Sequence, residues 1–104
     1  MINVMNVVTV PGDNAPDFEA AFSNRERLLD QAEGFVGFEL LRRKLDDGQV
    51  EFLVVSRWQD EESFQGWVRG DLFKKAHAKD GQRSFGGHSE IRRYDVIDVE
   101  EPVA

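Results

Sequence analysis

Residues 35–58 read FVGFELLRRKLDDGQVEFLVVSRW, two runs of apolar and β-branched residues on either side of Asp47 and Gly48. Runs of this kind predict two strands, over 35–44 and 50–58. Because glycine accepts a positive φ, the Asp-Gly pair favours a tight turn that makes the two strands antiparallel neighbours. The rest of the fold can be worked out from this hairpin.

Upstream of the hairpin, the sequence predicts a strand and then a helix. Residues 2–10 are rich in β-branched side chains, which favour a strand. Pro16 suits the first turn of a helix, and apolar residues at helical spacing continue to about Ala32, before Gly34 ends the helix. The apolar positions of this helix are Phe18, Ala21, Phe22, Leu28, Leu29 and Ala32.

Downstream of the hairpin, helical signals come first and a strand comes last. Asp60 is a typical cap for a helix that reaches about Arg69, and a second short helix is expected over 71–78. A polar loop over 79–87 and a strand over 89–99 follow. The order strand, helix, strand, strand, helices, strand predicts an α+β fold, the ferredoxin-like βαββαβ sandwich, in which helices cover one face of an antiparallel sheet.

The size and charge of the chain limit the functions that it can have. Its 104 residues predict one domain over 1–104, with a frayed tail over about 100–104. A formal net charge of −7 argues against nucleic acid and against an anionic membrane surface as partners. The absence of cysteine excludes disulfides and thiolate metal sites. No signal peptide or membrane span is visible, so we expect a cytoplasmic protein.

The predicted sheet carries apolar side chains on both faces. Along the strand over 50–58, one row holds Val50, Phe52, Val54, Ser56 and Trp58, and the other holds Glu51, Leu53, Val55 and Arg57. In the strand over 35–44, Val36, Phe38 and Leu40 are predicted to alternate with Phe35, Gly37, Glu39 and Leu41. An antiparallel sheet with one solvated face shows a cleaner alternation, and a monomer would expose a large apolar patch. We therefore expect a homodimer in which a second copy covers this face.

Three residues differ in chemistry from their predicted surroundings. Asn6 lies in an otherwise apolar row of the strand over 2–10, and it is either a group aimed at a ligand or an amide that bonds its own backbone at a bend. His77 follows Phe73 by one helical turn, and it is either a metal ligand or a surface residue near a helix end. Trp67 is either a pocket residue or core. Facing one apolar space, the three would make a pocket for a flat, metal-containing cofactor.

Arg25 and His88 are two further polar residues whose surroundings in the sequence suggest a role. Arg25 lies among the apolar positions of the first helix, so its side chain either extends to solvent or meets an acidic ligand group. His88 follows two glycines at the start of a strand and is interpreted as solvent-exposed. Two histidines without cysteine or an HExxH pattern argue against a zinc hydrolase, and no phosphate-binding glycine loop is present.

Several stretches taken together resemble a known family. They are NVVTVP over 6–11, GFVGFELLR over 34–42, the segment 58–67, and FKKAH over 73–77. Over nearly its whole length the chain resembles the IsdG-type heme-degrading monooxygenases of the antibiotic biosynthesis monooxygenase superfamily, and most closely the mycobacterial-type members. The combination of Asn6, Trp67 and His77 is the most specific part of this likeness. The resemblance implies dimerisation through the sheet face into a dimeric α+β barrel.

The resemblance also implies a role for each candidate residue. His77 would be the proximal ligand of the heme iron and Trp67 would press on the macrocycle, favouring a ruffled heme. Asn6 would donate a hydrogen bond on the distal side of the iron. The remaining residues of the implied heme pocket are Phe22, Arg25, Phe64 and Phe73.

The implied function is a heme-degrading monooxygenase that binds heme non-covalently, opens the porphyrin ring with dioxygen and electrons, and releases iron. Heme would be both substrate and cofactor. No reductant-binding motif is visible, so the electrons would come from a separate reductase or a small-molecule donor. Three alternatives remain: a heme carrier without turnover, a cofactor-free quinol monooxygenase of the same superfamily, and a dimeric scaffold without chemistry.

Overall fold

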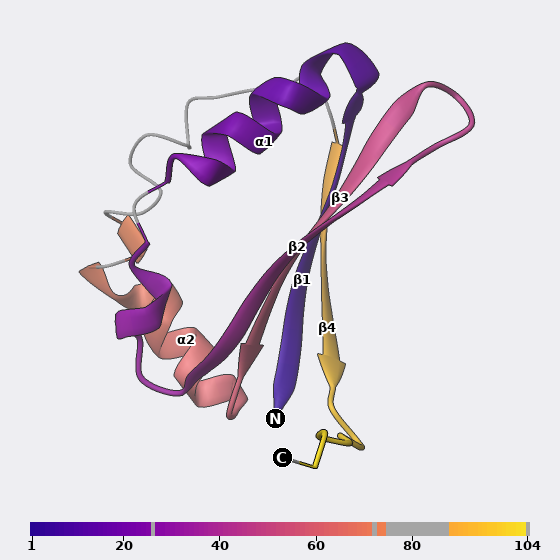
Figure 1. Cartoon of the computed structure of the whole chain (residues 1–104). Helices are drawn as coiled ribbons and strands as arrows, with labels where there is room; N and C mark the ends of the chain where they lie inside the picture. The colour runs from indigo at the N-terminus through magenta and orange to yellow at the C-terminus, as the bar shows by residue number, and fades with distance from the viewer. Residues whose placement is uncertain (26, 72, 75–87, 104) are drawn as a thin grey trace.

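The computed structural model describes residues 1–25, 27–71, 73–74 and 88–103, which form a four-stranded antiparallel sheet with helices on one side (Figure 1). The strands are β1 (Ile2–Pro11), β2 (Phe35–Lys44), β3 (Gln49–Trp58) and β4 (His88–Asp95). Their order across the sheet is β2-β3-β1-β4, so β1 pairs with both β3 and β4. This is the ferredoxin-like arrangement, and the fold predicted from the sequence is confirmed.

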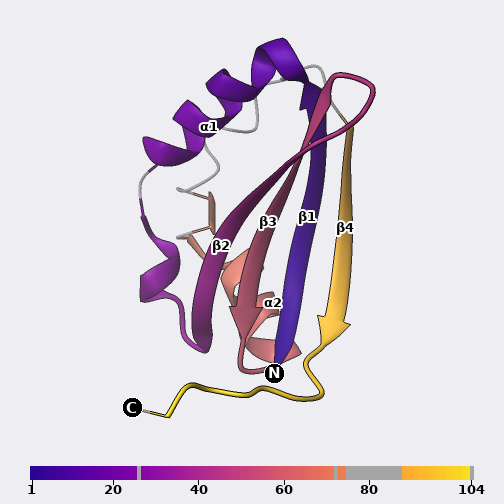
Figure 2. The same cartoon turned by 45° about the vertical axis from the view of Figure 1, so that its right-hand side comes forward.

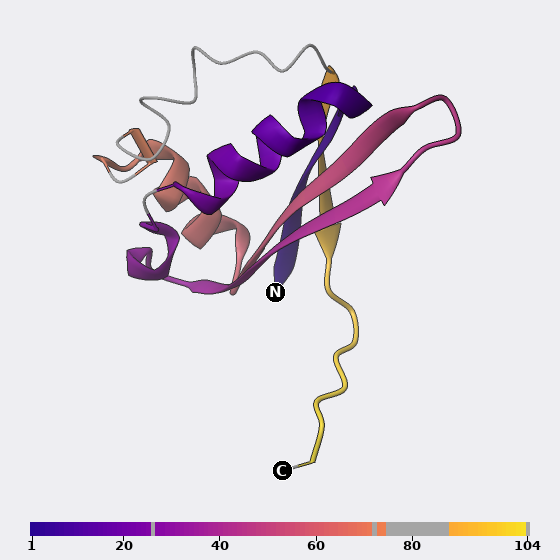
Figure 3. The same cartoon turned by 45° about the horizontal axis from the view of Figure 1, so that its top comes forward.

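Two helices cover the same face of the sheet (Figures 1 and 3). α1 (Ala15–Ser23) follows β1 through a short 3-10 turn, η1 (Gly12–Asn14), and α2 (Glu61–Arg69) follows β3. A second 3-10 turn, η2 (Leu29–Gln31), leads into β2. Figure 2 shows α1 toward one end of the strands and α2 toward the other. The middle of the sheet therefore lies between the two helices.

The start of α2 is fastened to the loop that precedes β2. Asp60 caps the helix as predicted, because its Oδ1 accepts a hydrogen bond from the Ser63 backbone N–H at 2.7 Å. Hydrogen bonding by the side chain of Ser63, and then by its backbone N–H, lowers the pKa of Asp60. In the loop, Gly34 has a φ of 79°, and its carbonyl accepts a hydrogen bond from the Gln59 N–H at 2.8 Å. The hydrogen bond between Gln59 and Gly34 therefore depends on the backbone conformation of Gly34.

Replacing Gly34 by alanine is expected to destabilise the protein by about 2–4 kcal/mol. A Cβ at this position would lie 2.0 Å from Ser63 Oγ, and the positive φ would add backbone strain. Urea unfolding followed by circular dichroism measures the change. The matched control is Gly66→Ala in α2, where a Cβ meets nothing within 4 Å and helix propensity predicts a gain of about 0.5–1 kcal/mol. Equal midpoints for the Gly34 variant and the wild type would refute the close packing.

The predicted helix over 16–32 was wrong in its second half, because α1 ends at Ser23. Serine and asparagine, which favour caps over helix interiors, stand at this point of the sequence. The carbonyl of Phe22 then accepts hydrogen bonds from Arg25 twice, from the backbone N–H at 3.3 Å and from Nη1 at 2.7 Å. The α-helix does not continue beyond this point. Leu28 is buried beside α2 and does not extend the apolar face of α1.

The predicted alternation of β2 was wrong at its beginning, because a β-bulge interrupts the pairing between Phe35 and Gly37. Phe35 and Phe38 both pair with residues of the helix-facing row of β3, so both rings lie on the helix side of the sheet. Val36 is left 43% exposed. A bulge adds one residue to a strand and thereby changes which side chains share a face.

The last strand ends at Asp95, four residues before the predicted end at Val99. Asp95 pairs with Ile2, the first residue of β1, and the N–H of Val96 donates to the carbonyl of Met1 at 2.9 Å. β1 offers no partner beyond this point, so the ladder stops. The C-terminal residues then run in extended form away from the sheet (Figure 3).

Part of the predicted second short helix can be compared with the structure. Asp71, Phe73 and Lys74 are helical. The remainder of the segment 71–78 and the predicted loop over 79–87 lie outside the described residues. In the described part of the chain, no helix has the length and the apolar character needed to cross a bilayer. The cytoplasmic location expected from the sequence stays a prediction.

The sheet face opposite the helices carries apolar side chains that no described helix covers. Leu41 is 42% exposed and Tyr94 is 50% exposed, whereas Val7 and Val55 are buried. A cavity of about 140 Å³ opens on this face, and Gly37, Glu39, Val55 and Arg57 are among the residues that line it. This is the face on which the sequence predicts a second copy, and the homodimer stays a prediction.

Candidate functional site

The helix-facing row of β1 is apolar at both ends and polar in the middle. Ile2 and Val4 are buried toward one end, Val10 is buried at the other, and Asn6 stands between them. The core on this side of the sheet is divided in the same way. The tryptophan cluster consists of Ile2, Val4, Leu28, Trp58 and Trp67. The phenylalanine cluster consists of Val10, Ala15, Phe18, Val50 and Phe52.

Asn6 carries a buried polar atom for which the described part of the chain provides no hydrogen-bond partner. Its backbone pairs with Val54 of β3 and with Ile91 of β4, so the residue is central in the sheet. The side-chain Oδ1 is buried and has no hydrogen-bond partner among the described residues. An unpaired buried acceptor costs about 1–3 kcal/mol. A donor group on a bound molecule would remove this cost, which favours the ligand interpretation of Asn6.

Trp67 projects from α2 into the tryptophan cluster and is 8% exposed. The centroid of its ring lies 6.3 Å from that of Trp58 and 5.8 Å from that of Phe73. Trp58 in turn lies 5.8 Å from Phe64. The structure therefore brings three predicted pocket residues, Trp67, Phe64 and Phe73, into one aromatic group. In this arrangement Trp67 packs as core, and its contact with a ligand stays a prediction.

Arg25 lies in the turn after α1, and its side chain covers aromatic rings. The guanidinium carbon is 5.7 Å from the centroid of Phe22 and 4.6 Å from the centroid of Phe38. Partial burial, together with the charge of Arg27, lowers the pKa of Arg25. A partly desolvated guanidinium interacts more strongly with a carboxylate than a fully hydrated one does. The arrangement therefore suits an acidic group on an otherwise apolar ligand.

Phe38 is a site residue that the sequence reasoning missed. A strict alternation along β2 gives no reason to place its ring beneath Arg25 and on the same face as Phe35. The bulge provides that reason, and the glycine within the GFVGF stretch was the signal that could have indicated it.

Of the two histidines, His77 and His88, only His88 is among the residues that the structure describes. His77 lies outside the described residues, and the described chain reaches Lys74, three positions before it. His88 is the exposed first residue of β4 and pairs with Thr9, on the row of β1 that faces away from Asn6. Its interpretation as solvent-exposed is confirmed. Within the described ranges, no group of three or more His, Asp or Glu side chains could hold a metal ion.

The cavity of about 140 Å³ does not belong to this site. Val55 pairs with Met5 and Arg57 pairs with Asn3, on the row of β1 opposite to that of Asn6. The candidate site is therefore the helix side of the sheet around Asn6. Its neighbours are the aromatic group formed by Trp67, Phe64 and Phe73, and the turn after α1 that holds Arg25.

This fold and site define a class of protein: a ferredoxin-like sandwich with an apolar site between helices and sheet, in which a side-chain amide oxygen, Oδ1 of Asn6, is buried. The family described as antibiotic biosynthesis monooxygenase matches residues 1–79. The chain belongs to the antibiotic biosynthesis monooxygenase family, and the relatives that it matches include heme-degrading monooxygenases.

One such relative is the heme-degrading monooxygenase of Listeria welshimeri, which is 39% identical over 82 residues, or 70% of this chain and 67% of the relative. Another is the mycobilin-producing heme oxygenase of Mycobacterium tuberculosis, 29% identical over 93 residues, or 89% of this chain and 86% of the relative. Among solved structures, MhuD of Mycobacterium tuberculosis with two hemes bound in its active site has a TM-score of 0.75 and 28% identity, and the match covers 96% of this chain and all of MhuD. The family indicated by the sequence resemblance is confirmed.

Proposed function

We propose that this protein is a heme-degrading monooxygenase that binds heme between the helices and the sheet and opens its ring with dioxygen and electrons from an external donor. The observation that carries the proposal is the buried Oδ1 of Asn6, which has no partner in the described part of the chain and lies between two apolar clusters. The similarity to heme-degrading relatives supports it.

The residues around Asn6 fit such a ligand. Heme is a flat, mostly apolar disc with two carboxylates, so its pocket needs aromatic walls and few polar groups. The aromatic group of Trp67, Phe64 and Phe73 would supply one wall. Phe22 would supply apolar surface beside Arg25, and the partly desolvated guanidinium of Arg25 would meet a propionate.

His77 would hold the iron through a neutral imidazole nitrogen. Bound heme supplies the redox-active iron and is itself the compound consumed. Asn6 would orient the reacting side through its amide, which can both donate and accept a hydrogen bond. Trp67 would contact the porphyrin ring. The electron donor would be a separate reductase or a small-molecule reductant.

A second copy of the chain would cover the open sheet face and make a homodimer. The apolar side chains that remain exposed there, Leu41 and Tyr94 among them, support this part of the proposal. The site around Asn6 lies on the other face, so each copy would hold its own heme.

Hemin affinity is expected to fall with decreasing pH if a histidine binds the iron. Ligation requires a neutral imidazole, whose ordinary pKa is about 6.5, so the dissociation constant should rise about tenfold per pH unit below roughly pH 6. Absorbance titrations at several pH values measure it, and His88→Ala serves as a control that should follow the wild-type curve. A flat affinity down to pH 5 would count against histidine ligation.

The proposed function is tested by titrating the protein with hemin and then adding ascorbate under air, with catalase present to remove free peroxide. A Soret band that saturates and then decays supports the proposal. A stable Soret band would instead identify a heme carrier. Absence of a band would move the assignment to a cofactor-free oxygenase or to a scaffold.

A further inference from the structure

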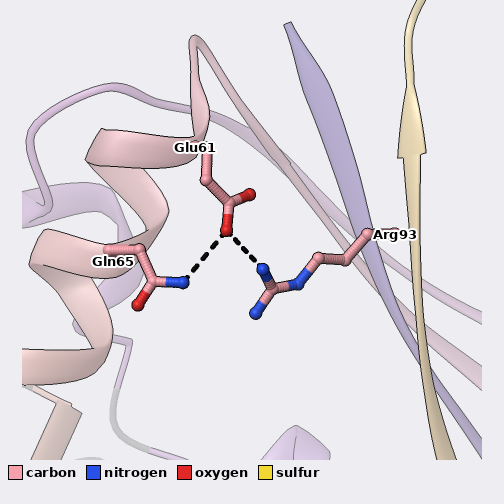
Figure 4. Close-up of polar contacts among 3 residues, drawn as sticks. All are labelled: Glu61, Gln65 and Arg93. Atoms are coloured by element: carbon pink, nitrogen blue, oxygen red, sulfur yellow. Dashed lines mark hydrogen bonds and ion pairs between the residues drawn. The ribbon is translucent and has the colours of Figure 1, made fainter.

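Helix α2 is tied to the edge strand β4 by a group of three polar side chains (Figure 4). Arg93 of β4 forms an ion pair through Nη1 with Oε1 of Glu61 in the first turn of α2. The same Oε1 accepts a hydrogen bond from Nε2 of Gln65, one helical turn along, at 3.0 Å. Arg93 therefore contacts α2 from the sheet side, through a carboxylate that the helix itself holds in place.

Arg93 also covers an aromatic ring of the same helix. Its guanidinium carbon lies 5.0 Å from the centroid of Phe64. Phe64 meets Trp58 edge-on at 5.8 Å, and Trp58 lies 6.3 Å from Trp67. A continuous series of contacts thus runs from the exposed guanidinium to the ring of Trp67. Because Phe64 and Trp67 are three residues apart on one helix, any rotation of α2 moves both rings together.

We propose that Arg93 is a positioning residue that fixes the orientation of α2 and thereby the ring of Trp67 in the ligand site. The proposal rests on the proposed function for its consequence in heme turnover. The contacts with Glu61 and Phe64 act at two different places on the helix, so they restrain its rotation as well as its distance from the sheet.

Because the side chains of Arg93 and Glu61 are exposed, the positioning role of their ion pair can be tested separately from its effect on folding stability. The side chains of Arg93 and Glu61 are 48% and 47% exposed, and ion pairs this exposed contribute little to folding stability. An Arg93 variant should therefore fold, with a urea midpoint close to that of the wild type. The Arg93 variant loses the restraint on the orientation of α2, and therefore on the orientation of the Trp67 ring.

The test compares Arg93→Gln with Arg92→Gln. Arg92 is the next residue of β4 and forms a similar exposed ion pair, with Glu90, on the opposite face of the sheet. In the protein without heme, near-ultraviolet circular dichroism reports the coupling of the Trp58 and Trp67 rings. Arg93→Gln is expected to lose part of this signal, and Arg92→Gln is expected to keep it. Equal near-ultraviolet spectra for both variants and the wild type would overturn the proposal.

Two further variants show whether the guanidinium geometry matters. Glu61→Gln should reproduce the spectral loss, because it removes the charge that holds Arg93. Arg93→Lys should restore it only in part, since lysine keeps the charge but lacks the planar group that stacks on Phe64. Full restoration by lysine would contradict the stacking contribution.

The heme-bound protein provides the functional readout. If hemin binds the wild type, Arg93→Gln should change the Soret circular dichroism and slow turnover by about two- to fivefold, the scale of an exposed pair. Arg92→Gln should change neither. Unchanged Soret dichroism and turnover in Arg93→Gln would refute the link to the site. If the wild type binds no hemin, the proposed function fails by itself, while the spectra of the heme-free protein still decide whether Arg93 orients Trp67.

Discussion

Replacing His77 by alanine is expected to abolish the ferric heme spectrum that the wild type gives with hemin. A single imidazole would be the only protein ligand of the iron, so its removal leaves apolar contact and the Arg25 interaction to hold the ring. The spectrum is measured by absorbance titration at a fixed, neutral pH. This is the largest effect that we expect from one substitution.

The control for this prediction is His88→Ala. His88 is exposed and lies on the row that faces away from Asn6, so the variant should titrate with hemin as the wild type does. If His88→Ala lost the band and His77→Ala kept it, the ligand assignment would be wrong.

Replacing Asn6 by valine is expected to have opposite effects on stability and on turnover. The substitution removes a buried acceptor that has no partner among the described residues, and it places a β-branched side chain in an apolar row. The heme-free protein should therefore gain about 1 kcal/mol in free energy of unfolding. Hemin should still bind, because the aromatic surfaces remain. Turnover should slow by about 100-fold, the usual cost of losing one oriented hydrogen-bonding group at a reacting centre.

Asn3→Val is the matched control on the same strand. Asn3 lies on the opposite face of β1, and its Oδ1 accepts a hydrogen bond from Arg57 Nε at 3.1 Å. This variant should lose stability by about 0.5–1.5 kcal/mol and leave turnover unchanged. If Asn6→Val were less stable than the wild type and degraded heme at the same rate, Asn6 would be a structural residue.

The arrangement of strands and the start of α2 could be predicted because each depends on local chemistry. The Asp47-Gly48 turn, with Gly48 at a φ of 84°, joins β2 to β3 as expected. Asp60 caps α2 through its own side chain. Once these elements and their order are known, few topologies remain, and the ferredoxin-like one follows.

The errors in the predicted fold arise where tertiary contacts decide the outcome. The end of α1 depends on Arg25 reaching back to the Phe22 carbonyl, which apolar spacing along the chain does not reveal. The end of β4 depends on where β1 begins, since Asp95 already pairs with Ile2. In both cases the sequence pattern continues past the point at which the partner is lost.

The candidate site was predictable to the extent that its residues contrast with their neighbours. Asn6 could be selected as a single amide in an apolar row, and the structure adds that its oxygen lacks a partner among the described residues. Phe38 and Arg93 could not be selected in this way. A phenylalanine in a strand and an arginine near a chain end are ordinary in a sequence, and their relation to the site exists only after β2 and β4 have taken their places.

The most direct test of the central claim is to follow the Soret band and released iron together in the wild-type protein. Hemin-loaded protein is mixed with ascorbate and catalase under air, in the presence of a ferrous-iron chelator that absorbs at a separate wavelength. Heme degradation predicts that the Soret band decays and that iron appears in step with the heme lost. A Soret band that persists while no iron is released would contradict the account.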